Sequence, residues 1–172
     1  MTLEVGEFTS PIGKIVVAVQ GGRLCALRFD EHWAPMQQLL KKRFDPVEFR
    51  KAADPAGVIT SLARYFAGDF DALDAIGVDS GGTPFQQRVW NTLRTIPAGR
   101  TVSYGYIAAA IGAPSAVRAV GAANGSNPVG IVVPCHRVIG SNGQLTGYGG
   151  GLERKRWLLA HESAQGELRV AS

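Results

Sequence analysis

Apolar residues at alternate positions predict two strands near the start of the chain, over residues 15–19 and 25–29. Gly21 and Gly22 lie between them and suit the two-residue turn of a β-hairpin, because glycine readily adopts the positive φ angles of such turns. Apolar residues then recur with helical spacing over 35–44 and 58–66. The first part of the chain is therefore predicted to combine a small β-sheet with helices.

A loose stretch rich in Gly, Asp and Ser ends at Ser80-Gly81-Gly82 and marks the predicted domain boundary. A helix is predicted to begin directly after it, because Thr83 can cap it, Pro84 suits its first position and Gln86 completes a capping box. The expected organisation has three parts: an α/β (α+β) domain over 1–80, a mainly helical domain over 83–165 and a tail over 166–172.

Two short helices are predicted next, the first capped by Ser103 and the second running from Ser115 to Asn124. The tight turn Gly112-Ala113-Pro114 joins them, so the pair resembles a helix-turn-helix. On the second helix we expect the inward stripe to be Val117, Val120 and Gly121. The last helix is predicted to follow the glycine-rich segment 147–151 and to end near His161-Glu162.

The outer face of the Ser115–Asn124 helix carries one long cation and otherwise little side-chain bulk. Its residues are Ser115, Arg118, Ala119, Ala122 and Gly125. A solvated helix face usually carries Glu, Lys and Gln, whereas small residues allow another surface to approach the backbone closely. Either a partner or the rest of this protein could be that surface.

Charge is distributed unevenly along the chain. Residues 1–81 hold 9 Lys and Arg against 11 Asp and Glu, whereas residues 82–172 hold 9 basic residues against 3 acidic ones. The basic second half is consistent with a polyanionic partner but does not establish one. Two cysteines exclude a disulfide framework, and neither a leader nor a membrane-length apolar run is seen. We therefore expect a cytoplasmic protein.

Pro134-Cys135-His136-Arg137 follows the apolar run 131–133 and is the strongest candidate for chemistry. Cysteine attacks as the thiolate, and a nearby histidine can accept the thiol proton. Neighbouring side chains of an extended chain point to opposite faces, so His136 needs a bend or a bridging water to reach the thiol. A carboxylate should orient the histidine. Spacing alone leaves Glu153 and Glu162 open for that role.

No metal site or cofactor is predicted. The two cysteines and three histidines lie far apart, without the close ligand pairs of structural zinc sites. The chain also lacks a phosphate-binding loop, a dinucleotide fingerprint and an HExxH helix.

Seven short segments of the chain together match, in the same order, the motifs of one known protein family. They are Thr83-Pro84-Phe85-Gln86, Ser103-Tyr104-Gly105, Arg118-Ala119-Val120-Gly121, Ser126-Asn127-Pro128, Pro134-Cys135-His136-Arg137-Val138-Ile139, Gly147-Tyr148 and Trp157-Leu158-Leu159-Ala160-His161-Glu162. Together they resemble the O6-alkylguanine-DNA alkyltransferases, also called methylated-DNA–protein-cysteine methyltransferases. The resemblance is strong over 83–162. It is looser before that, where it implies an α/β domain of ribonuclease-H-like type.

The resemblance implies single-turnover repair of O6-alkylguanine, with O4-alkylthymine left open as a second substrate. Cys135 would displace the alkyl group and keep it, after the nucleotide has flipped out of the duplex. His136 would act as the base through a water, and Glu162 would orient the imidazole. Tyr104 would help rotate the nucleotide and protonate the leaving guanine. Asn127 would brace the loop that carries the cysteine.

The resemblance also implies how DNA is held. The Ser115–Asn124 helix would enter the minor groove, and Arg118 would fill the space of the flipped base. The implied DNA-binding residues are Ser103, Tyr104, Arg118, Ala119, Ala122, Ala123 and Asn124, and the implied substrate pocket contains Val138, Tyr148, Gly149 and Gly130. The partner would be double-stranded DNA, bound by a monomer that can act cooperatively.

Three glycines depart from the pattern of some relatives. Gly125 replaces a second basic residue, which predicts weaker DNA binding, while Gly130 and Gly149 replace bulkier residues and predict a wider pocket. Two alternative functions remain. A non-catalytic lesion sensor, similar to the alkyltransferase-like proteins, would lack the reactive cysteine, and a cysteine hydrolase acting through a thioester would need an oxyanion site that the sequence does not mark.

Overall fold

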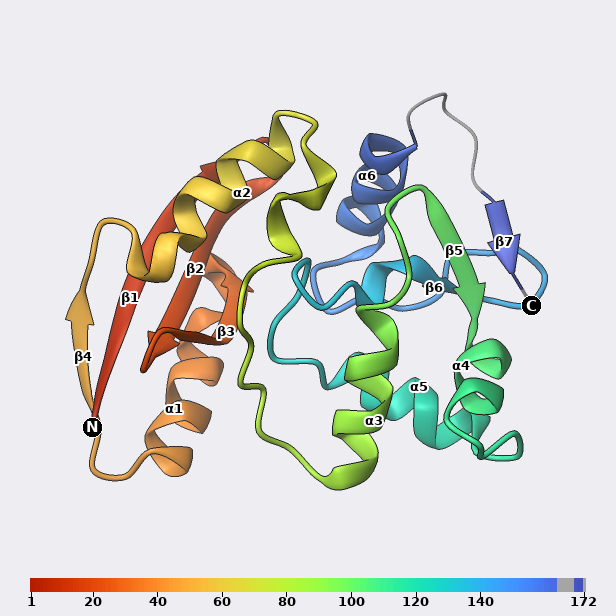
Figure 1. Cartoon of the computed structure of the whole chain (residues 1–172), viewed down its shortest axis with the longest axis horizontal. Coiled ribbons are helices and arrows are strands. Elements are labelled where there is room, and N and C mark those ends of the chain that lie inside the picture. The colour runs from red at the N-terminus through yellow and green to blue at the C-terminus, as the bar shows by residue number, and fades with distance from the viewer. Residues whose placement is uncertain (164–168, 172) are drawn as a thin grey trace. The chain divides into compact units, whose positions relative to one another are not determined.

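Figure 1 shows the computed structural model of the chain, which describes residues 1–163 and 169–171. The chain divides into two compact units, Met1–Ser80 and Gly81–Ser172. The first unit mixes a sheet with helices, and the second is mainly helical, as the fold class predicted from the sequence requires. None of the described helices is long and apolar enough to cross a membrane.

The amino-terminal unit is built on a four-stranded sheet of order β3-β2-β1-β4. The strands are β1 (Thr2–Ser10), β2 (Gly13–Gln20), β3 (Arg23–Phe29) and β4 (Glu48–Lys51). The predicted hairpin is β2 and β3, which pair antiparallel across Gly21 and Gly22, with φ angles of 58° and 78°. Strand β1 pairs antiparallel with β2 and parallel with β4, and the sequence patterns did not predict either β1 or β4.

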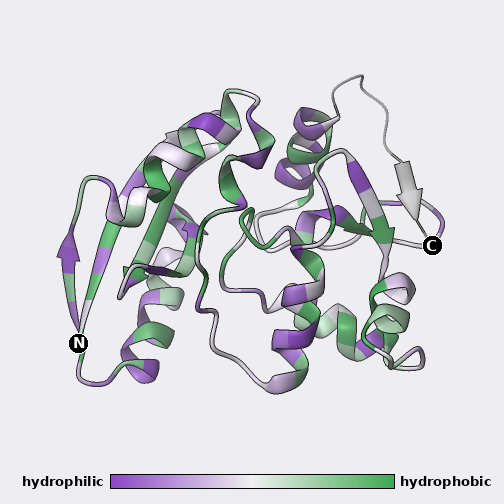
Figure 2. Cartoon of the chain, viewed as in Figure 1, coloured by the Kyte–Doolittle hydropathy of each residue, from purple (hydrophilic) through white to green (hydrophobic). Residues whose placement is uncertain are grey.

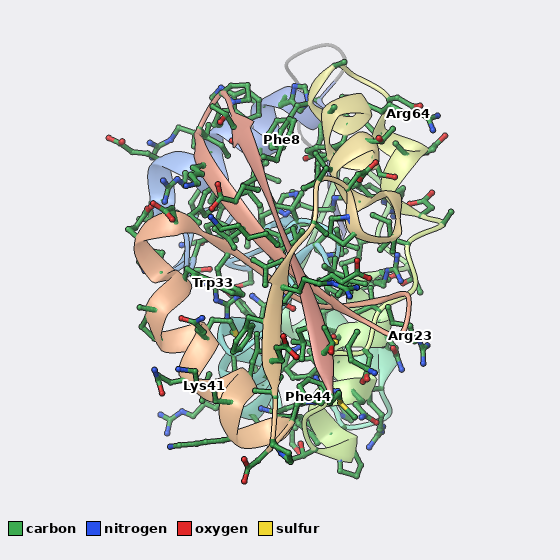
Figure 3. All side chains as sticks on the ribbon, turned by 90° about the vertical axis from the view of Figure 1, so that its left-hand side faces the viewer. Phe8, Arg23, Trp33, Lys41, Phe44 and Arg64 are labelled. Atoms are coloured by element: carbon green, nitrogen blue, oxygen red, sulfur yellow. The ribbon has the colours of Figure 1, made fainter. Side chains whose placement is uncertain are left out.

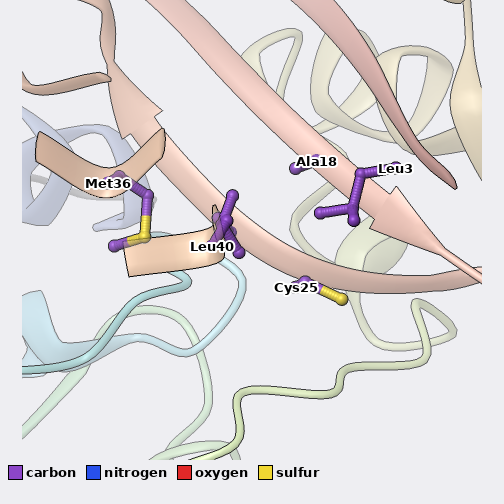
Figure 4. Packing of buried hydrophobic residues seen from close by; sticks show 6 residues of the cluster. Leu3, Ala18, Cys25, Met36 and Leu40 are labelled. Atoms are coloured by element: carbon purple, nitrogen blue, oxygen red, sulfur yellow. The ribbon is translucent and has the colours of Figure 1, made fainter. Parts of the chain in front are cut away.

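Helices cover both faces of this sheet. The two helices are α1 (Trp33–Arg43) and α2 (Val58–Phe66), with short 3₁₀ turns η1 (Asp30–His32), η2 (Pro55–Gly57) and η3 (Phe70–Leu73). Met36 and Leu40 of α1 pack on the face that carries Leu3 (Figure 4). Phe8 lies on the opposite face, because strand side chains alternate, and it stacks on Phe66 of α2 with ring centroids 5.7 Å apart.

The double coverage explains why β2 departs from the alternating pattern. All residues from Ile15 to Val19 are buried. Figure 2 shows β2 as apolar over most of its length, whereas the edge strand β4 is hydrophilic. Figure 3 looks onto this unit, with Lys41 of α1 and Arg64 of α2 at its periphery. The unit is thus an ordinary apolar core with charges outside.

The carboxy-terminal unit contains four helices and a small parallel sheet of order β6-β5-β7 among its described residues. The elements are α3 (Pro84–Leu93), β5 (Arg100–Ser103), α4 (Tyr104–Ala110), α5 (Val117–Gly125), η4 (Cys135–Arg137), β6 (Val138–Ile139), α6 (Leu152–Glu162) and β7 (Arg169–Ala171). Of the predicted tail 166–172, residues 166–168 and 172 lie outside the described residues. The prediction of a tail is wrong for 169–171, because they form β7 and pair with β5.

Two of the predicted helix starts, those capped by Thr83 and Ser103, are confirmed. The Thr83 hydroxyl accepts a hydrogen bond from the Gln86 amide at 3.1 Å, and the Gln86 side chain accepts one from the Thr83 amide at 2.9 Å. Ser103 caps α4 by accepting from the Tyr106 amide at 3.0 Å. These bonds satisfy amide groups that the first helical turn leaves without partners.

Helix α5 begins two residues later than predicted, and its inward face is different. Val120 is buried as expected, but Val117 is 41% exposed. Ala123 and Asn124 are buried instead. At 3.6 residues per turn, positions three and four beyond Val120 lie on the same face as Val120, whereas Val117 is in the first turn, at the exposed end of the helix.

Candidate active site

Cys135 lies in a tight turn rather than in an extended strand. The apolar run 131–133 is buried, and the 3₁₀ helix η4 then carries residues 135–137. The Cys135 amide donates to the Val133 carbonyl at 2.8 Å, and the Arg137 amide donates to the Pro134 carbonyl at 3.0 Å. Cys135 is 7% exposed. The turn removes the strand alternation that would have sent neighbouring side chains to opposite faces.

His136 and Glu162 form a buried pair. Nε2 of His136 lies 2.8 Å from Oε2 of Glu162, and neither side chain is exposed to solvent. Glu162 stands at the end of α6, whereas Glu153 is in the first turn of that helix and exposed. The structure therefore brings Glu162 to the histidine and leaves Glu153 away from it. The 26 residues between His136 and Glu162 explain why spacing alone left both carboxylates open.

Arg137 holds the same carboxylate from another side. Its Nε donates to Oε1 of Glu162 and its second terminal nitrogen donates to Oε2, each at 2.8 Å. A further nitrogen donates to the Ile96 carbonyl at 2.5 Å. Burial alone would raise the pKa of Glu162, but the His136 charge and the hydrogen bonds from Arg137 and His136 hold that pKa well below its usual range. Glu162 is therefore ionised at neutral pH.

The protonation of His136 follows from this environment. Burial lowers the pKa of His136 below its ordinary value, although the Glu162 charge and hydrogen bond oppose the shift. An ionised carboxylate can only accept, so Nε2 carries the proton of the neutral ring. Nδ1 is then an acceptor, and it is buried without a hydrogen-bond partner among the described residues. The ring is thus ready to take a proton at Nδ1.

Lys155 is a buried cation that the sequence patterns did not single out. Its Nζ donates to the Val138 carbonyl at 2.7 Å and to the Thr146 carbonyl at 3.1 Å. Burial lowers the pKa of Lys155 to about 8, and the nearby Cys135 charge opposes the shift. The sequence did contain a signal for this burial. Lys155 lies three residues before Leu158 and four before Leu159, which places it on the apolar face of α6. A lysine on such a face is unusual and places a positive charge near the cysteine.

Asn127 spans the loop that leads to the cysteine. Its side-chain nitrogen donates to the Val133 carbonyl at 2.8 Å, and its side-chain oxygen accepts from the Val129 amide at 2.9 Å. Both amide atoms are satisfied, so the loop is held at two points. This geometry fits the bracing role that the family resemblance implies.

Tyr104 and the pocket residues lie on three segments of the carboxy-terminal unit. The Tyr104 hydroxyl, at the start of α4, lies 2.5 Å from the Thr146 hydroxyl. The Tyr148 ring meets the His136 ring edge-on, with centroids 6.4 Å apart. Val138 is buried directly after η4. The two remaining pocket candidates, Gly130 and Gly149, are half-buried and exposed, respectively.

The predicted DNA-binding face is divided by the fold. Arg118, Ala119 and Ala122 are exposed on α5, as expected. Ala123 and Asn124 are buried, so their side chains do not lie on the exposed face that carries Arg118. Ser103 is also buried, and its hydroxyl accepts the capping hydrogen bond at the start of α4.

No three His, Cys, Asp or Glu side chains within 1–163 and 169–171 come together as a metal ion would require. The ionisable groups that do gather are His136, Arg137, Lys155 and Glu162 around the Cys135 turn. A thiol beside a neutral, carboxylate-oriented imidazole is suited to nucleophilic attack.

Comparisons with known proteins agree with this chemistry. The family model described as 6-O-methylguanine DNA methyltransferase, DNA binding domain, matches residues 84–164. The methylated-DNA–protein-cysteine methyltransferase of Salmonella typhimurium is 49% identical over 159 residues, which cover 91% of this chain and 93% of that protein. The protein of the same name from Mycobacterium tuberculosis is 48% identical, with 91% and 90% covered.

Solved structures are similar as well. The Mycobacterium tuberculosis OGT in complex with DNA has a TM-score of 0.79 and 46% identity, covering 94% of this chain and 93% of that chain. The O6-methylguanine-DNA methyltransferase from the archaeon Pyrococcus kodakaraensis has a TM-score of 0.67 and 27% identity, covering 94% and 99%. The chain therefore belongs to the family of methylated-DNA–protein-cysteine methyltransferases.

Proposed function

We propose that this protein repairs DNA by direct reversal, transferring the alkyl group of O6-alkylguanine to Cys135. The thiolate attacks the alkyl carbon, a carbon–sulfur bond forms, and the bond to guanine O6 breaks with its electron pair going to the base. The observation that carries the proposal is the buried His136–Glu162 pair beside Cys135, in a chain 49% identical to a methyltransferase of this type. The thioether is stable, so each molecule acts once.

The thiol proton would pass to His136. A bridging water between Cys135 and Nδ1 would link the two groups, since a buried polar atom is normally hydrogen-bonded to protein or to water. Glu162 would stabilise the imidazolium that forms, because its negative charge lies against Nε2. Lys155 would stabilise the thiolate by its charge.

The leaving guanine would take its proton from Tyr104, whose hydroxyl pairs with that of Thr146. The backbone groups of Cys135, Val138 and Tyr148-Gly149 would bind the edge of the guanine. Half-buried Gly130 and exposed Gly149 leave room for alkyl groups larger than methyl.

Helix α5 would enter the minor groove of double-stranded DNA as the second helix of a helix-turn-helix. Arg118 would occupy the space of the flipped nucleotide, and Ala119 and Ala122 would allow close approach. Flipping costs about a few kcal/mol, which contacts to the stack and phosphates would offset. We propose that the protein acts as a monomer in the cytoplasm.

The test is mass spectrometry after mixing the protein with duplex DNA that contains O6-methylguanine. One added methyl group per molecule is expected, on the peptide that contains Cys135. Release of many product molecules per protein would favour a hydrolase instead. Tight binding without methyl transfer would favour a lesion sensor.

A further inference from the structure

Asn124 projects from the inner face of α5 toward the cysteine turn. Its side-chain nitrogen donates to the Cys135 carbonyl at 3.3 Å, across 11 residues of sequence. The residue is 5% exposed. The same helix carries Arg118, Ala119 and Ala122 on its exposed face. A single side chain therefore joins the helix proposed to contact DNA to the backbone of the proposed nucleophile.

The other amide atom of Asn124 lies in an unfavourable place. Its side-chain oxygen is buried and accepts no hydrogen bond from the described residues. Turning the amide around would place that oxygen against the Cys135 carbonyl, where two acceptors would repel each other. The nitrogen therefore faces the carbonyl, and a buried acceptor stays unsatisfied.

This arrangement differs from that of two neighbours. Asn127 satisfies both of its amide atoms within one loop, as a bracing residue should. Trp90 of α3 anchors α5 from another side, by donating to the Ala123 carbonyl at 2.8 Å. Asn124 instead keeps an unpaired polar atom among buried side chains, where an apolar residue of similar size would be more favourable for folding alone. A cost of this kind is expected where a residue serves the reaction.

We propose that Asn124 is a positioning residue, which holds the Cys135 carbonyl and so aligns the thiol with the alkyl carbon of a bound lesion, an inference that rests on the proposed function. The hydrogen bond fixes the backbone of the residue that reacts. Backbone groups of Cys135 are also proposed to bind guanine. The orientation of this carbonyl therefore affects both the attacking thiol and the bound base. Asn124 acts through Cys135 and needs no contact with DNA.

The experiment compares Asn124→Leu with Trp90→Phe, each of which removes one hydrogen bond involving α5. Three quantities are measured: the melting temperature, the dissociation constant for methylated duplex DNA, and the rate of methyl transfer to Cys135 at saturating DNA. For Asn124→Leu we expect the rate to fall on the order of tenfold, with unchanged DNA binding and an equal or higher melting temperature. For Trp90→Phe we expect a lower melting temperature and an unchanged rate.

Three results would overturn the positioning role: an unchanged rate in Asn124→Leu, a rate loss matched by weaker DNA binding, or a rate loss explained by the unfolded fraction. The wild-type protein is measured beside the variants. If the wild type itself takes up no methyl group, the proposed function fails; if it does and Asn124→Leu reacts equally fast, only the role of Asn124 fails.

Discussion

The two compact units differ in what they bury. In the amino-terminal unit, Ser10 is the one buried polar side chain, and the rest of the core is apolar. In the described part of the carboxy-terminal unit, the buried side chains include His136, Arg137, Lys155 and Glu162. Burying charges lowers stability unless they are paired and hydrogen-bonded, so such a cluster indicates a site.

The two cysteines differ in their surroundings in the same way as the two units. Cys25 is 1% exposed and packs among Leu3, Met36 and Leu40, where burial raises the pKa of its thiol (Figure 4). Cys135 is almost as buried, yet it follows the apolar run 131–133 directly and precedes the imidazole of His136. Burial therefore does not distinguish the two thiols, whereas the imidazole next to Cys135 does, and it makes Cys135 the proposed nucleophile.

The largest effect is expected from exchanging the two cysteines for alanine. Cys135→Ala should abolish methyl uptake, because no other side chain can replace the sulfur. Cys25→Ala should keep full uptake and lower the free energy of unfolding by about 1 kcal/mol, from the small cavity left in the core. Intact-mass measurement reports methyl uptake, and urea unfolding reports the free energy of unfolding. Methylation of Cys135→Ala would show that Cys135 is not the residue that accepts the methyl group.

The next largest effect concerns Glu162. Glu162→Gln keeps the shape of the side chain but removes the charge that supports His136, so the transfer rate should fall by about 100-fold. The pH at which the rate is half-maximal should move upward, because an imidazolium without its carboxylate partner is less stable, so the Cys135 thiolate forms only at higher pH. Glu153→Gln, on the exposed first turn of the same helix, is the matched control and should react normally. An unshifted pH profile in Glu162→Gln would contradict the proposed transfer of the Cys135 proton to a His136 that Glu162 supports.

Lys155 tests whether the buried cation supports the thiolate. Lys155→Met should slow methyl transfer on the order of tenfold, since a nearby positive charge favours the ionised thiol. Burial lowers the pKa of Lys155 to about 8, so the wild-type rate should stop rising with pH above that value. Lys41→Met, in α1 of the other unit, should change neither quantity. A Lys155→Met profile identical to that of the wild type would remove the electrostatic role.

Arg118 extends the contrast to exposed charges. Arg118→Ala should slow the reaction with methylated duplex DNA by about tenfold, because nothing fills the space of the flipped nucleotide. Reaction with the free modified base should be nearly unchanged. Arg64→Ala, also an exposed arginine but in α2, should affect neither reaction. Equal losses on both substrates would show that Arg118 acts elsewhere than in the stack.

The smallest effect is a pH dependence of stability. The pKa of His136 is lowered in the fold, so the unfolded chain binds more protons as pH falls through about 6.5, its ordinary value. The free energy of unfolding should therefore decrease from pH 7 to pH 5. The depressed pKa of Glu162 adds a further loss below about 4.5. Urea unfolding of His136→Gln should lack the first decrease; an unchanged slope would place its origin elsewhere.

Local features of this fold were predictable because they depend on residues a few positions apart. The hairpin at Gly21-Gly22, the capping box of Thr83 and Gln86, and the Ser103 cap each involve hydrogen bonds or turns within a short segment. The end of α6 near Glu162 was predicted as well. The motif around Cys135 indicated the proposed nucleophile for the same reason.

Only the tertiary structure decided which distant groups meet. Spacing in the sequence left two carboxylates open for His136, and only the family resemblance implied Glu162. The docking of the α6 end brings Glu162 to His136 across 26 residues. Asn124 faces inward because α5 begins later than predicted and buries a different face from the one that its apolar residues indicate. Lys155 can be buried because the carbonyls of Val138 and Thr146 accept hydrogen bonds from its ammonium group. Periodicity predicts which face of an element is covered, whereas the partner on the other side depends on long-range packing that no local pattern contains.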